Sequence, residues 1–146
     1  MARRLSWAGL TPWHVANRLG RRLGVGFTSA PPVGFGGQPD GGAELAPDVW
    51  VMLEVEHSQT HPEGNVLKYW PWLERNQRRV ILVHAIAPDA RMRRGPRTDL
   101  TIWLGRKIET GLRGRFRYCR IELGTEREEE QVARAKATIA GSGVQP

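Results

Sequence analysis

Residues 38–69 read QPDGGAELAPDVWVMLEVEHSQTHPEGNVLKY, and the rest of the expected architecture follows from them. From Val49 to Glu56 the side chains are β-branched, aromatic or apolar until two acids appear, which is the composition of a strand buried on both faces. Because side chains alternate along a strand, Glu54 and Glu56 share one face. Desolvation and mutual repulsion disfavour such a pair unless a cation compensates it. The pattern therefore predicts a divalent metal site at the end of this strand.

Two aspartates upstream compete to be the third ligand. Asp48 lies six residues before Glu54 in a run with no turn former, so at ~3.3 Å per residue the two lie about 20 Å apart and cannot share a cation. A chain reversal at residues 46–48 would instead set residues near 40 opposite residues near 54, to within a residue or two of register. Asp40 is therefore the predicted third ligand. Ordinary turn chemistry of the Pro-Asp-Gly-Gly run at 39–42 is the alternative explanation for it.

Three short motifs in this stretch resemble the PD-(D/E)XK nuclease superfamily, the fold of many restriction endonucleases and other DNA-cleaving enzymes. They are the Pro-Asp pair at 39–40, the Glu-Val-Glu triplet at 54–56 and the Lys-Tyr pair at 68–69 in a helical stretch. In that family the Asp and the first acid of the second motif bind magnesium, and the last motif residue, usually Lys, positions or activates the attacking water. Glu56 stands where that Lys is expected. Some members carry Glu there, and in others the Lys has moved to the following helix, which nominates Lys68.

The resemblance extends over residues 11–123 as an order of elements. It implies an α/β fold with an α-β-β-β-α-β core, in which a mixed central sheet is flanked by helices, and here an extra C-terminal helix follows. The implied activity is Mg²⁺-dependent or Mn²⁺-dependent hydrolysis of phosphodiester bonds, with DNA as the expected substrate. Glu56 would bind a second ion or orient the water, and Lys68 would neutralise charge on the pentavalent phosphate. The implied catalytic residues are Asp40, Glu54, Glu56 and Lys68, and the implied metal ligands are Asp40, Glu54, Glu56 and the backbone carbonyl of Val55.

The remaining elements divide the chain into a basic arm at 1–10, a single domain at 11–140 and a tail at 141–146 that is expected to be disordered. Thr11 and Pro12 suit a helix start, with Trp13, Ala16 and Leu19 at helical spacing and Gly24 as the stop. Pro71 should kink or divide the helix that contains Lys68. The other expected elements are a strand at 25–30, a buried strand at 78–88 parallel to 49–56, a helix capped by Thr98, an edge strand at 115–123 and a last helix.

Charge and composition point to a nucleic-acid partner. The chain has 22 Lys plus Arg against 15 acids, a net charge of +7 and a pI near 10.7, and such a field attracts polyanions. Arginines are concentrated in two segments, 91–97 and 113–120. Gln59 is expected to touch DNA or the ion shell, with a loop or helix-cap role as the alternative. The predicted phosphate contacts are Arg91, Arg93, Arg94 and Arg97 in a basic loop.

The sequence says less about cellular location and oligomeric state. The single Cys119 excludes an internal disulfide and a multi-Cys zinc site, so a reducing cytoplasm is the expected location. No apolar run approaches the length of a membrane span, so no membrane partner is expected. A nuclease this small would need a homodimer to cut both strands at once.

Each candidate site residue has a less specific explanation. Glu54 and Glu56 could pair with neighbouring arginines at a sheet edge, and Lys68 could be an exposed helix lysine. His57 and His61 suggest a zinc hydrolase as an alternative function, although no HExxH motif is present. His84, inside an apolar strand, is expected to be a hydrogen-bonded core residue. The alternative functions are a nucleic-acid-binding protein that kept the fold and lost catalysis, and a basic structural or assembly protein.

Overall fold

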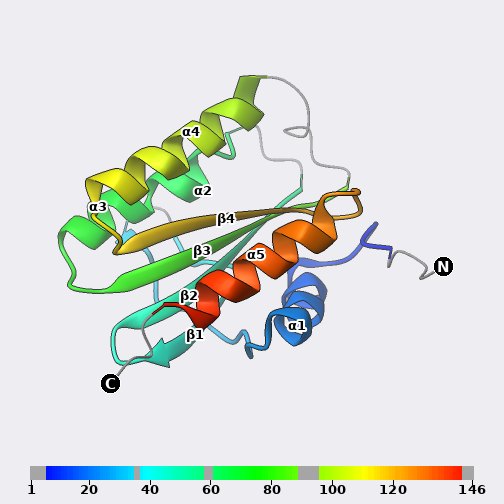
Figure 1. Ribbon diagram of the computed structural model, residues 1–146, viewed down its shortest axis with the longest axis horizontal. Coiled ribbons are helices and arrows are strands. Elements are labelled where there is room, and N and C mark those ends of the chain that lie inside the picture. The colour runs from blue at the N-terminus through cyan, green and yellow to red at the C-terminus, as the bar shows by residue number, and fades with distance from the viewer. Residues whose placement is uncertain (1–5, 35–36, 58–60, 89–95, 143–146) are drawn as a thin grey trace.

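The computed structural model describes residues 6–34, 37–57, 61–88 and 96–142, with residues 96 and 97 described by their backbone alone. Five helices and four strands are defined within these ranges (Figure 1). In chain order they are α1 (Pro12–Leu23), β1 (Gly41–Ala46), β2 (Val49–Glu56), α2 (Gly64–Leu67), α3 (Tyr69–Glu74), β3 (Arg79–Ile86), α4 (Pro96–Gly111), β4 (Phe116–Glu122) and α5 (Glu128–Ala140).

The strands form one mixed sheet in the order β1-β2-β3-β4. β1 pairs antiparallel with β2, whereas β2 with β3 and β3 with β4 are parallel. The predicted α/β class, with a mixed sheet flanked by helices and a C-terminal helix, is therefore confirmed. The strand expected at 25–30 is present only as an isolated bridge between Thr28 and Gly42, and the first of the four described strands is β1 instead. Helices α2 and α3 separate β2 from β3, so the expected α-β-β-β-α-β core is not confirmed.

The hairpin of β1 and β2 fixes which residues face one another. Gly41 pairs with Leu53, but nearer the turn Ala46 pairs with Val49, so the extra residue Leu45 is accommodated as a β-bulge. Asp48 occupies the turn with φ of 63°, a left-handed conformation that Asp tolerates better than most residues. The predicted reversal at residues 46–48 is confirmed, and Asp48 lies at the far end of β2 from the acids.

Helices cover both faces of the sheet (Figure 1). The sheet separates two apolar clusters, one on each face. On one face, α1 and α5 pack over β-strand residues such as Val51, Val83 and Ile121. On the other, α3 and α4 pack over residues such as Met52, Leu82 and Phe116. Parallel strands covered on both faces need continuous apolar runs, and β2 has the bounds expected from its sequence.

Helix α1 begins and ends as its sequence indicates, and the helix around Lys68 is divided as expected. The Thr11 hydroxyl accepts a hydrogen bond from the His14 N–H at the start of α1, and Gly24 ends it with φ of 75°. Trp13 was expected on the buried face, but it is 68% exposed and Val15 is buried instead. The helix predicted around Lys68 is divided into α2 and α3. Pro71 explains the division, because it has no N–H to offer the carbonyl of Leu67.

The start of α4 differs from the expected one. The helix begins at Pro96 rather than after Thr98. Proline is favoured at the first helical position because its fixed φ suits the helix and its missing N–H is not needed there. Of the described residues, no helix is both long and apolar enough to cross a membrane, and the longest, α4, has 16 residues.

Gly105 is the position where α4 approaches β4 most closely. A Cβ there would lie 2.5 Å from Cγ of Tyr118, a buried ring. Helix propensity alone favours Ala over Gly by about 1 kcal/mol, whereas overpacking a core costs about 1–3 kcal/mol. We expect Gly105→Ala to lower the free energy of unfolding measured in urea. Gly64→Ala, where a Cβ meets nothing within 4 Å, is the control and should not destabilise; a Gly105→Ala protein as stable as the control would contradict the expectation.

Candidate active site

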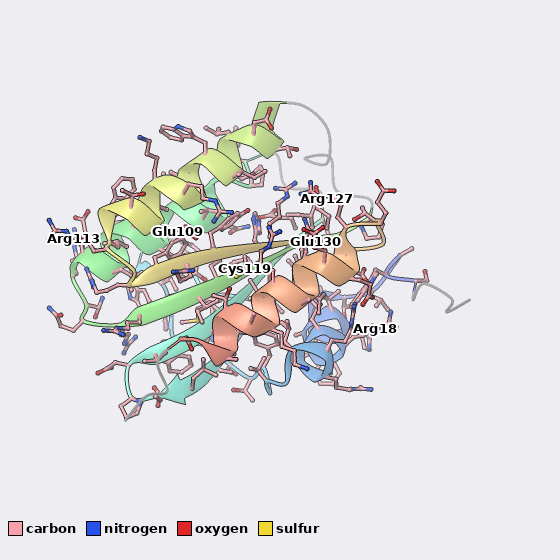
Figure 2. The ribbon with its side chains drawn as sticks, viewed as in Figure 1. Arg18, Glu109, Arg113, Cys119, Arg127 and Glu130 are labelled. Carbon is pink, nitrogen blue, oxygen red and sulfur yellow. The ribbon has the colours of Figure 1, made fainter. Side chains whose placement is uncertain are left out.

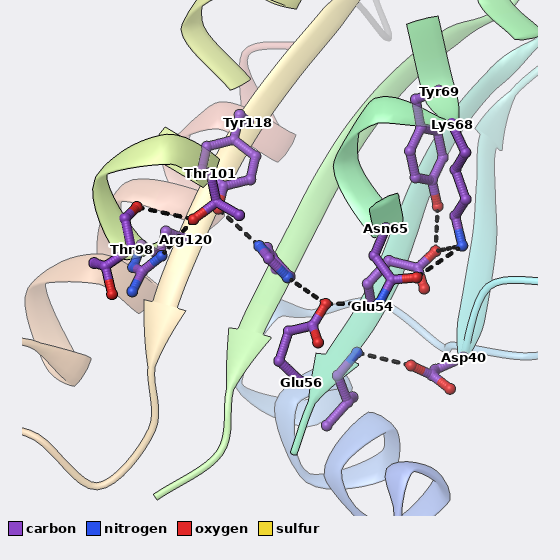
Figure 3. Close-up of polar contacts among 12 residues, drawn as sticks. Asp40, Glu54, Glu56, Asn65, Lys68, Tyr69, Thr98, Thr101, Tyr118 and Arg120 are labelled. Carbon is purple, nitrogen blue, oxygen red and sulfur yellow. Dashed lines mark hydrogen bonds and ion pairs between the residues drawn. The ribbon is translucent and has the colours of Figure 1, made fainter. Parts of the chain in front are cut away.

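The predicted acids lie where β2 ends beside β3, under α2 and α3 (Figure 3). Glu54 is 3% exposed and Glu56 1% exposed, so both carboxyl groups are removed from bulk water. Both belong to the face of the sheet that carries Met52 and Leu82. Buried carboxyl groups need compensating partners, and the two glutamates obtain them from different residues.

Glu54 is bound by two residues of the α2–α3 segment. Its Oε2 lies 2.8 Å from Lys68 Nζ and accepts a hydrogen bond of 2.8 Å from the Tyr69 hydroxyl (Figure 3). The Lys68 side chain is only 6% exposed, so it is not a solvated helix lysine. Lys68 occupies the junction between α2 and α3, and Asn65 Oδ1 lies 3.4 Å from its Nζ.

Burial dominates the ionisation of this cluster. Desolvation raises the pKa of Glu54 to about 7, even though the charge and hydrogen bond of Lys68 and the hydrogen bond of Tyr69 act in the opposite direction. Desolvation and then the nearby Glu54 carboxylate raise the pKa of Tyr69 well above its usual value. Near neutral pH, Glu54 therefore exchanges between its protonated and ionised forms, while Tyr69 remains a hydrogen-bond donor.

Asp40 approaches the same cluster from the start of β1. Its N–H donates to the Leu53 carbonyl at 3.0 Å, and its Oδ2 accepts from the Val55 N–H at 2.7 Å (Figure 3). A strand residue directs its N–H and C=O to the same side, so the Val55 carbonyl also faces the side where Asp40 lies. Desolvation raises the pKa of Asp40, although part of the residue remains exposed to solvent.

Glu56 belongs to a second set of contacts that crosses the sheet. Its Oε1 accepts from Asn65 Nδ2 at 2.6 Å and lies 2.9 Å from His84 Nε2. His84 Nδ1 lies 2.7 Å from the Tyr118 hydroxyl. Glu56 Oε2 is buried and has no hydrogen-bond partner in the described part of the chain. One carboxylate oxygen of Glu56 is thus fixed, and the other retains its capacity to accept.

The protonation of His84 follows from its partners. Burial lowers the pKa of His84, so the ring is neutral. A proton on Nε2 lets His84 donate to Glu56, and Nδ1 then accepts from the Tyr118 hydroxyl; this tautomer is assigned from the hydrogen-bond network. Desolvation raises the pKa of Tyr118 to about 12, which keeps its proton available. The expectation that His84 is a hydrogen-bonded core residue is confirmed.

The three predicted acids do not form a common metal-binding group. Within the described ranges, no three His, Cys, Asp or Glu residues form a group that could hold a metal ion. Asp40 and Glu54 lie on one side of the cluster, and Glu56 is bound to His84 and Asn65. Magnesium binds through one or two carboxylates and keeps several waters. The donor chemistry of Asp40, Glu54 and the Val55 carbonyl therefore suits it, and the unpartnered Glu56 Oε2 is a further oxygen acceptor.

The remaining site predictions fall elsewhere. Gln59, Arg91, Arg93 and Arg94 lie outside the described residues, and Arg97 lies in α4 without a described side chain. His61 is exposed and pairs with Glu63 at 3.3 Å, so the geometry adds nothing to the zinc hydrolase alternative.

Sequence reasoning assigned no site role to three contact residues. Asn65 and Tyr69 lie four apart on the helical segment that follows the acidic strand, a spacing that places two side chains on one helical face. Tyr118 lies in the edge strand expected at 115–123. Its link to His84 depends on β3 and β4 being neighbours, which no local pattern specifies.

Comparison with known proteins provides no relative from which a role could be transferred, because no family model, no curated protein and no solved structure matches this chain.

Proposed function

We propose that the protein is a Mg²⁺-dependent nuclease that hydrolyses phosphodiester bonds, with DNA as its substrate. The observation that carries the proposal is the buried pair of Lys68 Nζ and Glu54 Oε2 at 2.8 Å, beside a second carboxylate, Asp40. An ammonium group next to carboxylates at a strand end is suited to phosphoryl chemistry, since it can stabilise charge that develops on a phosphate. The resemblance of the three motifs to PD-(D/E)XK nucleases supports the same function.

In this proposal each residue has a separate role. Asp40, Glu54 and the Val55 carbonyl would hold the ion, which when bound would lower the pKa of a water molecule and offset phosphate charge. Lys68 would leave Glu54 and donate to a phosphate oxygen. Tyr69 would hold the Glu54 carboxylate in orientation through its 2.8 Å hydrogen bond. Glu56 Oε2, which has no described partner, would accept a hydrogen bond from the attacking water.

One observation favours a nucleic-acid-binding protein without catalysis as the second candidate. Glu54 is 3% exposed, and its Oε2 already has two donors. A closed ion pair of this kind can be purely structural. The two candidates differ in one assay: incubation of supercoiled plasmid with Mg²⁺ or Mn²⁺, with EDTA as the control. Nicking that requires the metal supports the nuclease, and intact plasmid under every metal would retire it.

Calorimetric titration with Mg²⁺ tests the ligands without any cleavage. Because the pKa of Glu54 is raised to about 7, the ion must displace a proton from Glu54 below that pH. We expect the affinity to rise with pH, by up to about tenfold per unit well below pH 7, and to level off above it. Glu54→Gln should remove most of the binding and its pH dependence. Glu44→Gln, an exposed acid on β1, should leave both unchanged; equal binding by wild type and Glu54→Gln would exclude Glu54 as a ligand.

A further inference from the structure

A trough lined by arginines runs along the free edge of β4, between α4 and α5. Two adjoining cavities of about 460 and 240 Å³ form it, and they share Arg117, Arg134 and Thr138 as lining residues. Figure 2 shows this region, with Cys119 of β4 between the two helices. We call it the arginine trough; its arginines are Arg79, Arg106, Arg117, Arg120, Arg127 and Arg134.

Positive charge exceeds negative charge in the trough, although Arg106, Arg120, Arg127 and Arg134 each pair with an acid. Of the described residues that line the two cavities, Glu109 is the sole acid. The side chains of Arg79 and Arg117 are exposed and have no hydrogen bond or ion pair with another described residue. Arg134 pairs with Glu130 at 2.7 Å, but both side chains are largely exposed, and solvent-exposed pairs are weak enough for a phosphate to compete. Arginine also presents a planar fork that matches phosphate geometry.

The edge strand itself is closed to strand addition. On β4 the outward N–H of Tyr118 donates to Glu109 Oε1 of α4 at 2.6 Å, and that of Glu122 donates to Gln131 Oε1 of α5 at 2.6 Å. A partner that extends the sheet needs free backbone groups along the edge. Because side chains occupy two of these amides, the chemistry that remains available in the trough is the arginine charge.

The dimensions favour a polymer over a single phosphate group. The lining residues extend along α5 from Arg127 to Ser142, which at ~1.5 Å per residue is about 22 Å. A DNA strand advances about 3.4 Å per nucleotide, so this length covers roughly six phosphates. Tyr118 is the one aromatic lining residue described, and its ring is buried. Single strands are held largely by base stacking on aromatic side chains, so the trough suits the backbone of a duplex.

We propose that the arginine trough binds the phosphate backbone of double-stranded DNA. The surface is separate from the Asp40 and Glu54 cluster, since β4 is two strands from β2 and neither Asp40, Glu54 nor Lys68 lines it. It extends the proposed function, because the duplex held there would be the substrate of the nuclease. Binding in the trough needs neither metal nor cleavage, so the two proposals can fail independently.

The test measures binding of a fluorescein-labelled 20-base-pair duplex to the full chain. Binding is monitored by fluorescence anisotropy in a buffer that contains EDTA. We expect Arg117→Glu to weaken binding by about tenfold at moderate salt, and Arg79→Ala with Arg117→Ala to lower the slope of log Kd against log salt by about two. Arg21→Glu is the matched control. It makes the same change in net charge at an exposed position of α1, outside the trough, so it should have a much smaller effect.

Several results would overturn the proposal. The proposal fails if the wild type does not bind the duplex, or if Arg117→Glu and Arg21→Glu lose equal affinity for it. It also fails if the same arginines bind single-stranded DNA more tightly than the duplex, or if they bind inorganic phosphate but not DNA. Circular dichroism and thermal unfolding should show that each variant is folded. Loss of binding in Arg117→Glu, in a protein that never nicks plasmid, would support the trough and retire the nuclease.

Discussion

Replacing Lys68 with methionine should reduce Mg²⁺-dependent plasmid nicking by about 10²–10³-fold, the usual effect of removing one preorganised electrostatic donor. The ammonium group is the one cation that contacts Glu54 in the described structure, and methionine keeps most of the buried stem. Lys136→Met, at an exposed position of α5, is the matched control and should cut at the wild-type rate. Equal activity in the two variants would remove Lys68 from the mechanism.

The same variant has a readout that does not require activity. The charge of Lys68 is the largest influence that lowers the pKa of Glu54, so its removal should move that pKa upward from about 7. Carboxyl-carbon NMR of Glu54 in wild type and Lys68→Met measures the direction. The protein should remain folded, because Glu54 can take up a proton once its partner is lost. A pKa that stays near 7 would mean that the ion pair does not persist in solution.

The second large effect concerns stability. His84→Leu should lower the free energy of unfolding by about 1.5–3 kcal/mol, the range for a hydrogen bond from a neutral donor to a charged group. Leucine fills a similar volume, but it leaves Glu56 Oε1 with Asn65 as its remaining donor and the Tyr118 hydroxyl without its acceptor. Tyr118→Phe removes the hydroxyl that contacts His84, Arg120 and Thr101, but it leaves the Glu56 contact with His84 in place, so it should cost less, about 1 kcal/mol. Urea unfolding measures both, and similar small losses for the two would show that the chain of contacts contributes little.

The pH dependence of these variants has a defined sign. The pKa of His84 is lowered on folding, so its contribution is present above the unfolded value of 6.5 and is lost as pH falls. The pKa of Glu54 is raised, so its contribution is present below 4.5 and is lost as pH rises through about 7. The two oppose each other in the wild type. In His84→Leu only the Glu54 contribution remains, so the deficit relative to wild type should be smaller at pH 5 than at pH 8.

Local patterns were sufficient for β2, β3 and β4 and for the chain reversal before β2, but not for β1. The apolar run that ends in two acids specified β2, and the distance argument at Asp48 specified the chain reversal and the approach of Asp40 to Glu54. The strand expected at 25–30 is reduced to a bridge, in a segment where glycine lowers the cost of leaving the extended state. Trp13 has helical spacing but lies exposed, because periodicity does not state how wide the buried face is.

Glu54 and Glu56 contact different residues, and this difference depends on tertiary structure. Glu54 and Glu56 have the same sequence signal, two acids on one strand face. Their partners are set by the α2–α3 break, which turns Lys68 and Tyr69 toward Glu54, and by β3, which brings His84 beside Glu56. Neither the break angle nor the neighbouring strand is encoded near the acids. The nomination of Lys68 came from the family resemblance, and its burial could not be inferred from helical periodicity.

The bulge at Leu45 determines the side of the sheet on which Asp40 appears. With Leu45 unpaired, Gly41 faces Leu53, and the same register sets residue 40 against Glu54. Cross-strand partners present their side chains to one surface. If Leu45 paired with Trp50 instead of bulging, every pairing beyond it would slip by one residue, and Asp40 would face Val55, among the apolar residues packed under α1 and α5. Closing the bulge, away from the acids of the candidate site, would thus dismantle the proposed magnesium centre, whereas residues added at the exposed Pro47 and Asp48 would leave it intact.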